Sequence, residues 1–227
     1  MAGSAGIADY LMDTPQVNRK QIDDLRAWFF AKDRSISLAQ NCLYYLFTNQ
    51  ANGSYASDFF ISETILSVAA ASVTFSNIPQ NFGSLRLIIN ARSSAAAEID
   101  TVLMRFNNDS GAFYDVEALT GNGVTASASA VRGNASMGIG ICEGANSRGN
   151  NFGPSFVWIF DYSRTVAESW AISLAATFGN VSADADLFIQ VRANRWRNLN
   201  QVTSIMIMPS TGPNFAANSR FSLYGVL

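Results

Sequence analysis

Several carboxylates lie close together in the middle of the sequence, at Glu98, Asp100, Asp109, Asp115 and Glu117. Two opposed carboxyl groups can hydrolyse a glycoside, because one donates a proton while the other attacks or stabilises the sugar. However, Asp115 and Glu117 are two residues apart in a predicted strand, so their side chains share one face and repel each other. We therefore favour a solvated strand face and a hairpin turn over a glycosidase, and we expect no enzyme.

The sequence contains no histidine, which excludes histidine-based catalytic triads and metal sites. The segment "NNDSG" at 107–111 offers oxygen ligands to calcium, but it lacks the acidic run and the distant glutamate of a calcium loop. Asp, Ser and Gly are also ordinary residues of a type I turn. No phosphate-binding loop, nucleophile elbow or Cys-x-x-Cys motif is present. We predict no metal and no cofactor.

Exposed aromatic side chains could stack on sugar rings, and the candidates are Tyr114, Trp158, Tyr162, Trp170 and Trp196. Trp158 lies in "FVWIFDY" with apolar neighbours on both sides, which predicts a core position. Trp196 lies between Arg195 and Arg197 in "RANRWRNLN", which we interpret as a loop with an exposed indole. These three residues are candidates for contact with a glycan, or equally for contact between subunits, where Trp and Arg are enriched.

The composition is poor in charge. Charged residues make up 14% of the chain, against about 25% in typical soluble domains, and the net charge is −2. A surface so short of charge predicts contact with another surface, hence an oligomer or an assembly component. Nothing suggests a nucleic-acid partner or membrane insertion, because basic clusters, a signal peptide and a long apolar run are all missing. Cys42 and Cys142 are expected to be free thiols, although a single disulfide stays open.

The first 53 residues have the character of a short α-helical segment. Thr14 is a helix cap, Pro15 occupies the first helical position, and an apolar stripe follows at helical spacing. The stripe consists of Ile22, Leu25, Trp28 and Phe29. A second apolar helix is predicted in "SISLAQNCLYYLFTNQ". We expect the stripe to dock on another protein or to join subunits; packing on the chain's own sandwich is the alternative.

Residues 54–227 alternate short β segments with turn signals, giving about ten strands in our interpretation. With no helical period to supply crossovers, this pattern predicts an all-β fold, an antiparallel jelly-roll-like β-sandwich. The glycine-rich stretches "GNASMGIG" and "ICEGANSRGNNFGPS" are predicted to be loops. The segment "SRFSLYGV" is predicted to be an internal strand, bonded on both sides.

Five ordered segments resemble a family of tailed-bacteriophage virion proteins over residues 73–227: "VTFSNIPQNFGSLRLIINARS", "MRFNNDSGAFY", "NFGPSFVWIFDYS", a strand ending at Trp196, and "VTSIMIMPSTGPNFAANSRFSLYGVL". The resemblance implies a jelly-roll-like sandwich ending in an "SxFSLYGI"-type strand. It also implies a structural protein on a phage head or tail, as a fibre, tip or decoration, and often a trimer. The N-terminal segment lies outside the resemblance; in such proteins this part commonly attaches to the particle.

These observations lead us to expect a non-enzymatic virion protein, assembled in the host cytoplasm. It would be a surface-exposed fibre or capsid decoration, anchored by its N-terminal helices to capsid or tail proteins and assembled as a homotrimer. Two rival functions stay open. One is a receptor-binding tail fibre tip that recognises a host surface glycan; the other is a glycan-degrading enzyme. Replacing Asp109 with Asn together with Glu117 with Gln would abolish activity only in the enzyme.

Overall fold

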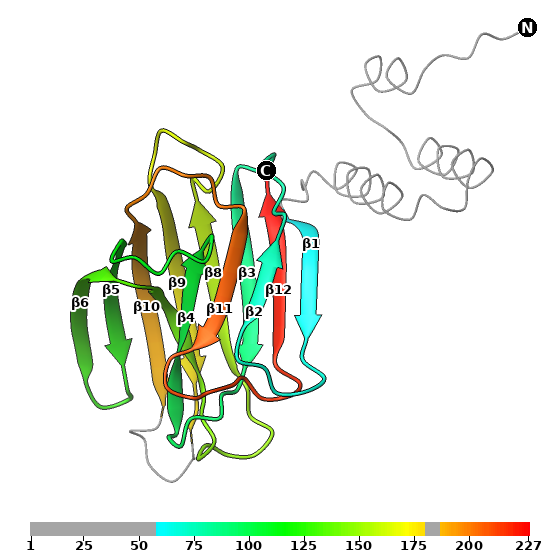
Figure 1. Ribbon diagram of the computed structural model, residues 1–227. Helices are drawn as coiled ribbons and strands as arrows, with labels where there is room; N and C mark the ends of the chain where they lie inside the picture. Colours follow the sequence, from blue (N-terminus) through cyan, green and yellow to red (C-terminus); the bar gives the residue numbers. More distant parts are fainter. Residues whose placement is uncertain (1–57, 180–186) are drawn as a thin grey trace, which may run out of the picture. The chain divides into compact units, whose positions relative to one another are not determined.

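The computed structural model describes residues 58–179 and 187–227, and every regular element in these ranges is a β-strand. The strands form two antiparallel sheets, of eight and four strands, and all but the first two strand residues belong to one compact unit that spans Phe60–Leu227. The predicted all-β class with antiparallel sheets is therefore confirmed (Figure 1). The predicted N-terminal helices, with Ile22, Leu25, Trp28 and Phe29, lie outside the described residues.

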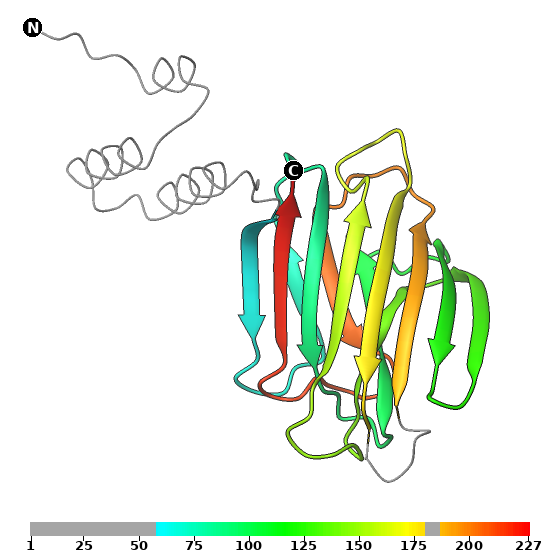
Figure 2. The same cartoon turned by 180° about the vertical axis from the view of Figure 1, so that it is seen from behind.

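The large sheet has eight strands in the spatial order β1 (Asp58–Ile65), β12 (Arg220–Val226), β3 (Ser84–Ala91), β8 (Gly153–Phe160), β9 (Ser169–Thr177), β10 (Phe188–Trp196), β5 (Tyr114–Gly121) and β6 (Ala126–Asn134). The small sheet has the order β2 (Val73–Ser76), β11 (Ser204–Pro209), β4 (Ile99–Phe106) and β7 (Met137–Glu143). In Figure 1 the small sheet lies in front of the large one, and Figure 2 shows the large sheet from behind. No apolar helix of membrane-spanning length occurs in the described ranges.

The core lies between the sheets. Strand alternation directs one set of side chains inward, and these are almost fully buried. They include Leu85, Leu87 and Ile89 from β3, Val157 and Ile159 from β8, Val102, Met104 and Phe106 from β4, and Ile205 and Ile207 from β11. Cys142 is a buried free thiol in this core, and burial raises its pKa to about 12.

The prediction for the last strand is confirmed. β12 lies between β1 and β3, and it pairs with β3 along its whole length, from Arg220 opposite Asn90 to Val226 opposite Ser84. Phe221 and Leu223 of β12 are buried in the core. The strand is thus an internal part of the sheet.

One prediction is wrong. The two consecutive glycine-rich stretches that we interpreted as loops contain β7 across their junction, and all seven of its residues are buried. Side chains on Gly138 and Gly140 would strike the Arg192 guanidinium and the Ser155 hydroxyl of the large sheet. Glycine is present at these positions because β7 approaches the large sheet closely.

Candidate functional site

The face of the large sheet turned away from the small sheet, called the outer face, carries large apolar side chains. Their neighbours along each strand, such as Val157 and Ala171, point into the core. The outward side chains are between 39% and 60% exposed: Phe156 and Phe160 on β8, Trp170, Ile172 and Leu174 on β9, Ile189 and Val191 on β10, and Leu119 on β5. Figure 2 shows these strands side by side at the centre of the outer face.

The strand register aligns four of these side chains into one row. Phe156 lies opposite Leu174, Leu174 lies opposite Val191, and Val191 lies opposite Leu119. An antiparallel sheet with one solvated face normally turns its apolar residues inward and its polar residues outward. β8 carries large apolar residues on both faces, and β9 reverses the rule: Trp170, Ile172 and Leu174 point outward, whereas its buried positions hold Ser, Thr and Ala. A contiguous exposed apolar surface marks an interaction site. The outer face is therefore the candidate functional surface of the protein.

Trp158 belongs to this face, and the expectation that it is a core residue is wrong. It is only partly buried, and the Arg86 guanidinium lies 5.9 Å from the centroid of its ring. Its apolar neighbours in "FVWIFDY" had suggested the core. They reflect instead a strand whose two faces are both apolar.

Trp196 is the opposite case, and its predicted exposure is wrong. It is 1% exposed and points inward from the end of β10, stacked at 6.3 Å on Tyr114. The edge of Phe106 packs on it at 5.6 Å between centroids. The segment interpreted as a loop is the continuation of β10, and Trp196 falls on the inward side of its alternation. Trp196 therefore cannot contact a glycan or another subunit.

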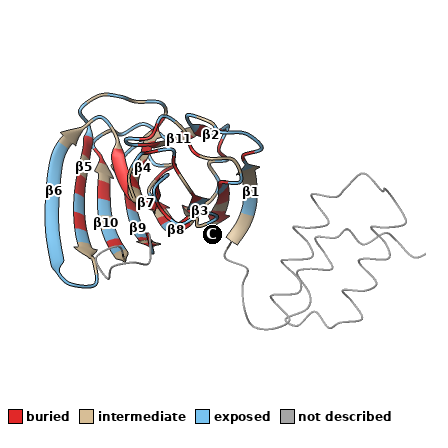
Figure 3. Cartoon of the chain, turned by 90° about the horizontal axis from the view of Figure 1, so that it is seen from below, coloured by how far each residue is buried: buried red, intermediate tan, exposed pale blue. Residues whose placement is uncertain are grey.

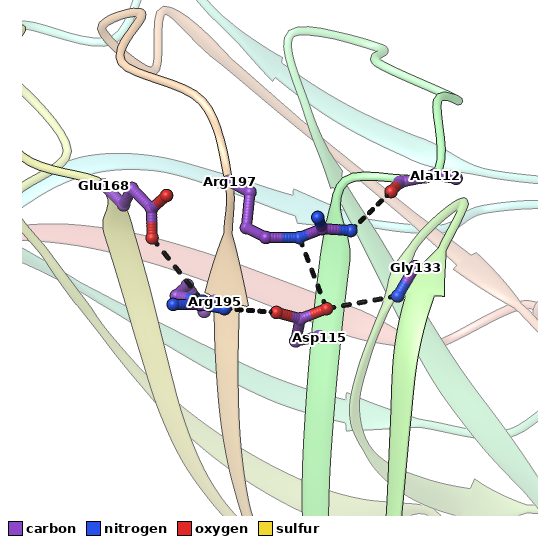
Figure 4. A network of polar contacts seen from close by, with 6 residues as sticks. All are labelled: Ala112, Asp115, Gly133, Glu168, Arg195 and Arg197. Atoms are coloured by element: carbon purple, nitrogen blue, oxygen red, sulfur yellow. Dashed lines mark hydrogen bonds and ion pairs between the residues drawn. The ribbon is translucent and has the colours of Figure 1, made fainter.

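Arg195 and Arg197, the other two candidates, flank Trp196 and join a polar network at one end of the outer face (Figure 4). Arg195 Nη2 donates to Asp115 Oδ2 at 2.6 Å, and its Nε lies 3.5 Å from Glu168 Oε2. Arg197 Nε lies 3.4 Å from Asp115 Oδ1, and its Nη2 donates to the Ala112 carbonyl at 2.8 Å. The network ties β9, β10 and β5 together.

The electrostatics of Asp115 follow from this network. The hydrogen bond from Arg195 lowers the pKa of the Asp115 carboxyl, and the same bond raises the pKa of Arg195. The Gly133 amide also donates to Asp115 Oδ1, at 3.1 Å. With these donors around it, Asp115 is engaged in holding strands together and is a poor general acid.

Next to this network the outer face has a hollow of about 210 Å³, lined by Trp170, Ala193, Arg195, Asp115, Glu117, Ala130 and Arg132 among others. The hollow exists because Ala193 and Ala130 leave space beside longer side chains. It is smaller than the typical ligand site of roughly 300–1,000 Å³. A hollow of this size suits a single side chain or a single sugar ring.

Asp109 and Asp100, two further carboxylates of the cluster in the sequence, have structural roles. Asp109 accepts hydrogen bonds from Trp196 Nε1 at 2.9 Å and from the Gly111 amide at 2.8 Å. Buried Asp100 accepts from the amides of Thr211 and Gly212, at 3.1 and 3.0 Å. Within the described ranges, no group of three or more Cys, Asp or Glu side chains is placed to hold a metal ion.

No protein-family model matches the chain, and no curated protein matches it. Among solved structures, it is similar to the carbohydrate-binding module described as "Ruminococcus gnavus IT-sialidase CBM40 bound to alpha2,3 sialyllactose". The identity is 12%, the match covers 74% of this chain and 94% of that one, and the TM-score is 0.29. A TM-score this low lends no support to any ligand or function for this chain.

Proposed function

We propose that this chain is a non-enzymatic structural component of a tailed-phage virion, which assembles through the outer face of its large sheet. The apolar row from Phe156 through Leu174 and Val191 to Leu119 is the observation that carries the proposal. Such a surface is unfavourable in water and favours contact with another protein. The assignment to a virion, as a fibre or decoration type, rests on the sequence resemblance over residues 73–227.

An energetic estimate supports a multivalent contact. Each of the eight large outward side chains retains about half of its exposure, so covering it gains roughly 0.7–1.5 kcal/mol. The sum, about 6–12 kcal/mol, is comparable to the ~4–15 kcal/mol lost in association. A single contact of this kind is therefore weak, and symmetry that repeats it makes the assembly stable. The homotrimer, and anchoring by residues 1–53 on capsid or tail proteins, are parts of this proposal.

The receptor-binding alternative has one observation in its favour. Trp170 lies in the hollow with Arg195 and Glu117, so an aromatic ring, a cation and a carboxylate face the same small space. A glycan array probed with the full chain tests it. Binding that is lost in Trp170→Leu and retained in Trp158→Leu would favour this alternative, and absence of binding excludes it.

Two measurements test the structural function. Peptides of this chain should be found by mass spectrometry in gradient-purified phage particles, and their absence would contradict the virion assignment. In solution, Leu174→Glu places a charge in the apolar row, so the mass of the full-length assembly measured by light scattering should fall. Leu199→Glu is the matched control, because Leu199 is also an exposed leucine, 53% against 39% for Leu174, but lies in a loop after β10.

A further inference from the structure

The strand β6 is exposed on both faces as well as along one edge. Of its nine residues, seven are exposed and two are intermediate, and Val131 on the inner side is 48% exposed. Figure 3 shows β6 in the exposed colour almost throughout, at the end of the large sheet. It pairs with β5 on one side, and no other described strand pairs with it. A strand held by a single neighbour gains little from burial.

The open edge of β6 lacks the usual protection. Natural edge strands are blocked by proline, lysine, inward charges or early bulges, because their free N–H and C=O groups recruit other strands. The sequence "ASASAVRGN" has no proline and no lysine, and its only charge is Arg132. The irregularity opposite β5 occurs only at the far end, near Gly133. From Ala126 to Val131 the edge is uncharged, and its side chains are Ala and Ser apart from Val131.

Two opposite charges beside this edge have no partner within the described ranges. Glu117 on β5 lies opposite Ala130 on β6, and its side chain is exposed on the outer face. Neither Glu117 nor Arg132 forms an ion pair or a side-chain hydrogen bond with a described residue. In a chain this poor in charge, both groups are available to a partner.

We propose that β6 pairs antiparallel with β6 of a second copy of this chain, about a two-fold axis at Val131. In this register Val131 lies opposite Val131 of the second copy, so two half-exposed valines cover each other on the inner side. Ala130 lies opposite Arg132 of the second copy. Because strands are about 4.8 Å apart, Glu117 and that Arg132 are then about 10 Å apart at Cα, with only the Ala130 methyl between them. Both side chains are long enough to meet.

The second copy is favoured over an unrelated strand because the edge is complementary to itself. In this register Ser129 lies opposite Gly133 and Ala128 opposite Asn134 of the second copy, and the two-fold axis produces the Glu117–Arg132 contact twice. The contact does not depend on the virion assignment, and it uses the sheet edge, whereas the proposed assembly surface is the outer face. Combined with three-fold contacts elsewhere, it would link one trimer to the next.

Charge reversal in the full-length protein tests the register. Glu117→Arg alone and Arg132→Glu alone should each raise the dissociation constant of the two-fold contact about tenfold. The double variant restores the opposite pair and should recover most of the wild-type affinity. Sedimentation over a concentration series measures the change as a halving of the assembly mass. Arg148→Glu, in an exposed loop, is the control and should change nothing.

Hydrogen exchange gives a second readout, because the outward amides of β6 should become protected as concentration rises. Leu174→Glu should weaken assembly through the outer face but leave the protection of the β6 amides intact. The experiment therefore tests the outer-face contact and the β6 contact independently. The proposal is overturned by a wild-type chain whose β6 amides stay unprotected at every concentration. It is equally overturned by single reversals that associate like wild type, or by a double variant that recovers nothing.

Discussion

The indole nitrogen of Trp196 donates a 2.9 Å hydrogen bond to Asp109 Oδ2, a residue 87 positions earlier in the chain. Trp196 is the largest fully buried side chain in the described ranges, and Asp109 lies in the turn after β4. The bond therefore fastens a turn that follows the small sheet to the end of β10 in the large one. It also gives the only polar atom of the indole an acceptor away from water.

Replacing Asp109 with Ala should lower the free energy of unfolding by about 1–3 kcal/mol, because a buried N–H donor loses its acceptor. Asp109→Asn should cost less, since an amide oxygen remains. Urea denaturation measures both. Asp161→Asn is the control, because Asn also tolerates the left-handed φ of Asp161. Among the described residues the Asp161 carboxylate pairs only with exposed Arg164, so its loss should cost well under about 1 kcal/mol. Equal losses for Asp109→Ala and Asp161→Asn would contradict the role given to the bond.

Arg192 is a largely buried cation, and burial lowers its pKa. Its Nε donates to Gln190 Oε1 at 3.0 Å, and no carboxylate of the described residues pairs with it. Because an uncompensated charge is costly in the interior, Arg192→Met should raise the free energy of unfolding by about 1 kcal/mol. Arg148→Met on the surface should leave stability unchanged in the same assay. A clear loss of stability in Arg192→Met would show that the charge has a stabilising partner.

Gly144 is closely surrounded by backbone. A Cβ at this position would strike the carbonyl of Ala97, and backbone atoms cannot move away as a flexible side chain does. Gly144→Ala should therefore lower the free energy of unfolding by roughly 2–4 kcal/mol. Gly149→Ala is a matched control five positions away, because nothing lies within 4 Å of its added methyl. Similar stabilities for the two variants would show that the loop before β8 rearranges easily.

Asp115 gives a pH dependence with a defined sign. Its pKa is lower in the folded chain than in the unfolded chain, chiefly through the hydrogen bond from Arg195. Its ion pairs therefore add stability above about pH 4, and this contribution disappears as the pH falls through the lowered pKa. Asp115→Asn should be less stable than wild type at neutral pH, with a difference that shrinks in acid. Glu117→Gln removes a carboxylate of the same strand that has no partner within the described part of its own chain, so it should show no such trend at a concentration at which the chain does not self-associate.

Most strands could be predicted from the sequence, because alternation and turn residues are local signals. β7 could not, since its glycines are required by the close approach of the large sheet, which is a tertiary property. The burial of individual residues was harder still. Trp158 and Trp196 were assigned from their neighbours, but which face of a sheet is covered depends on where the other sheet lies. The actual positions of Trp158 and Trp196 follow from the alternation of side chains along each strand together with the position of the second sheet.

Only part of the candidate surface could be predicted from the sequence. Low charge content predicted contact with another surface, and Arg195 and Arg197 do lie at one end of the outer face. The apolar row from Phe156 to Leu119 could not be predicted from the sequence. Its four residues come from four separate strands, and only the strand register aligns them. The same holds for Glu117 and Arg132, whose nearness to an open edge depends on β6 being the terminal strand.

The position of β12 has a consequence for biosynthesis. It fills the place between β1 and β3, yet it is the last of the described strands to leave the ribosome. Until then β1 and β3 each present an unpaired edge, and their nascent backbone groups stay open to neighbouring chains. Closing that gap needs contacts between distant parts of the chain, which form slowly. Completion of the large sheet thus waits for the synthesis of β12, and until then a chaperone that shields strand edges would raise the yield of native protein.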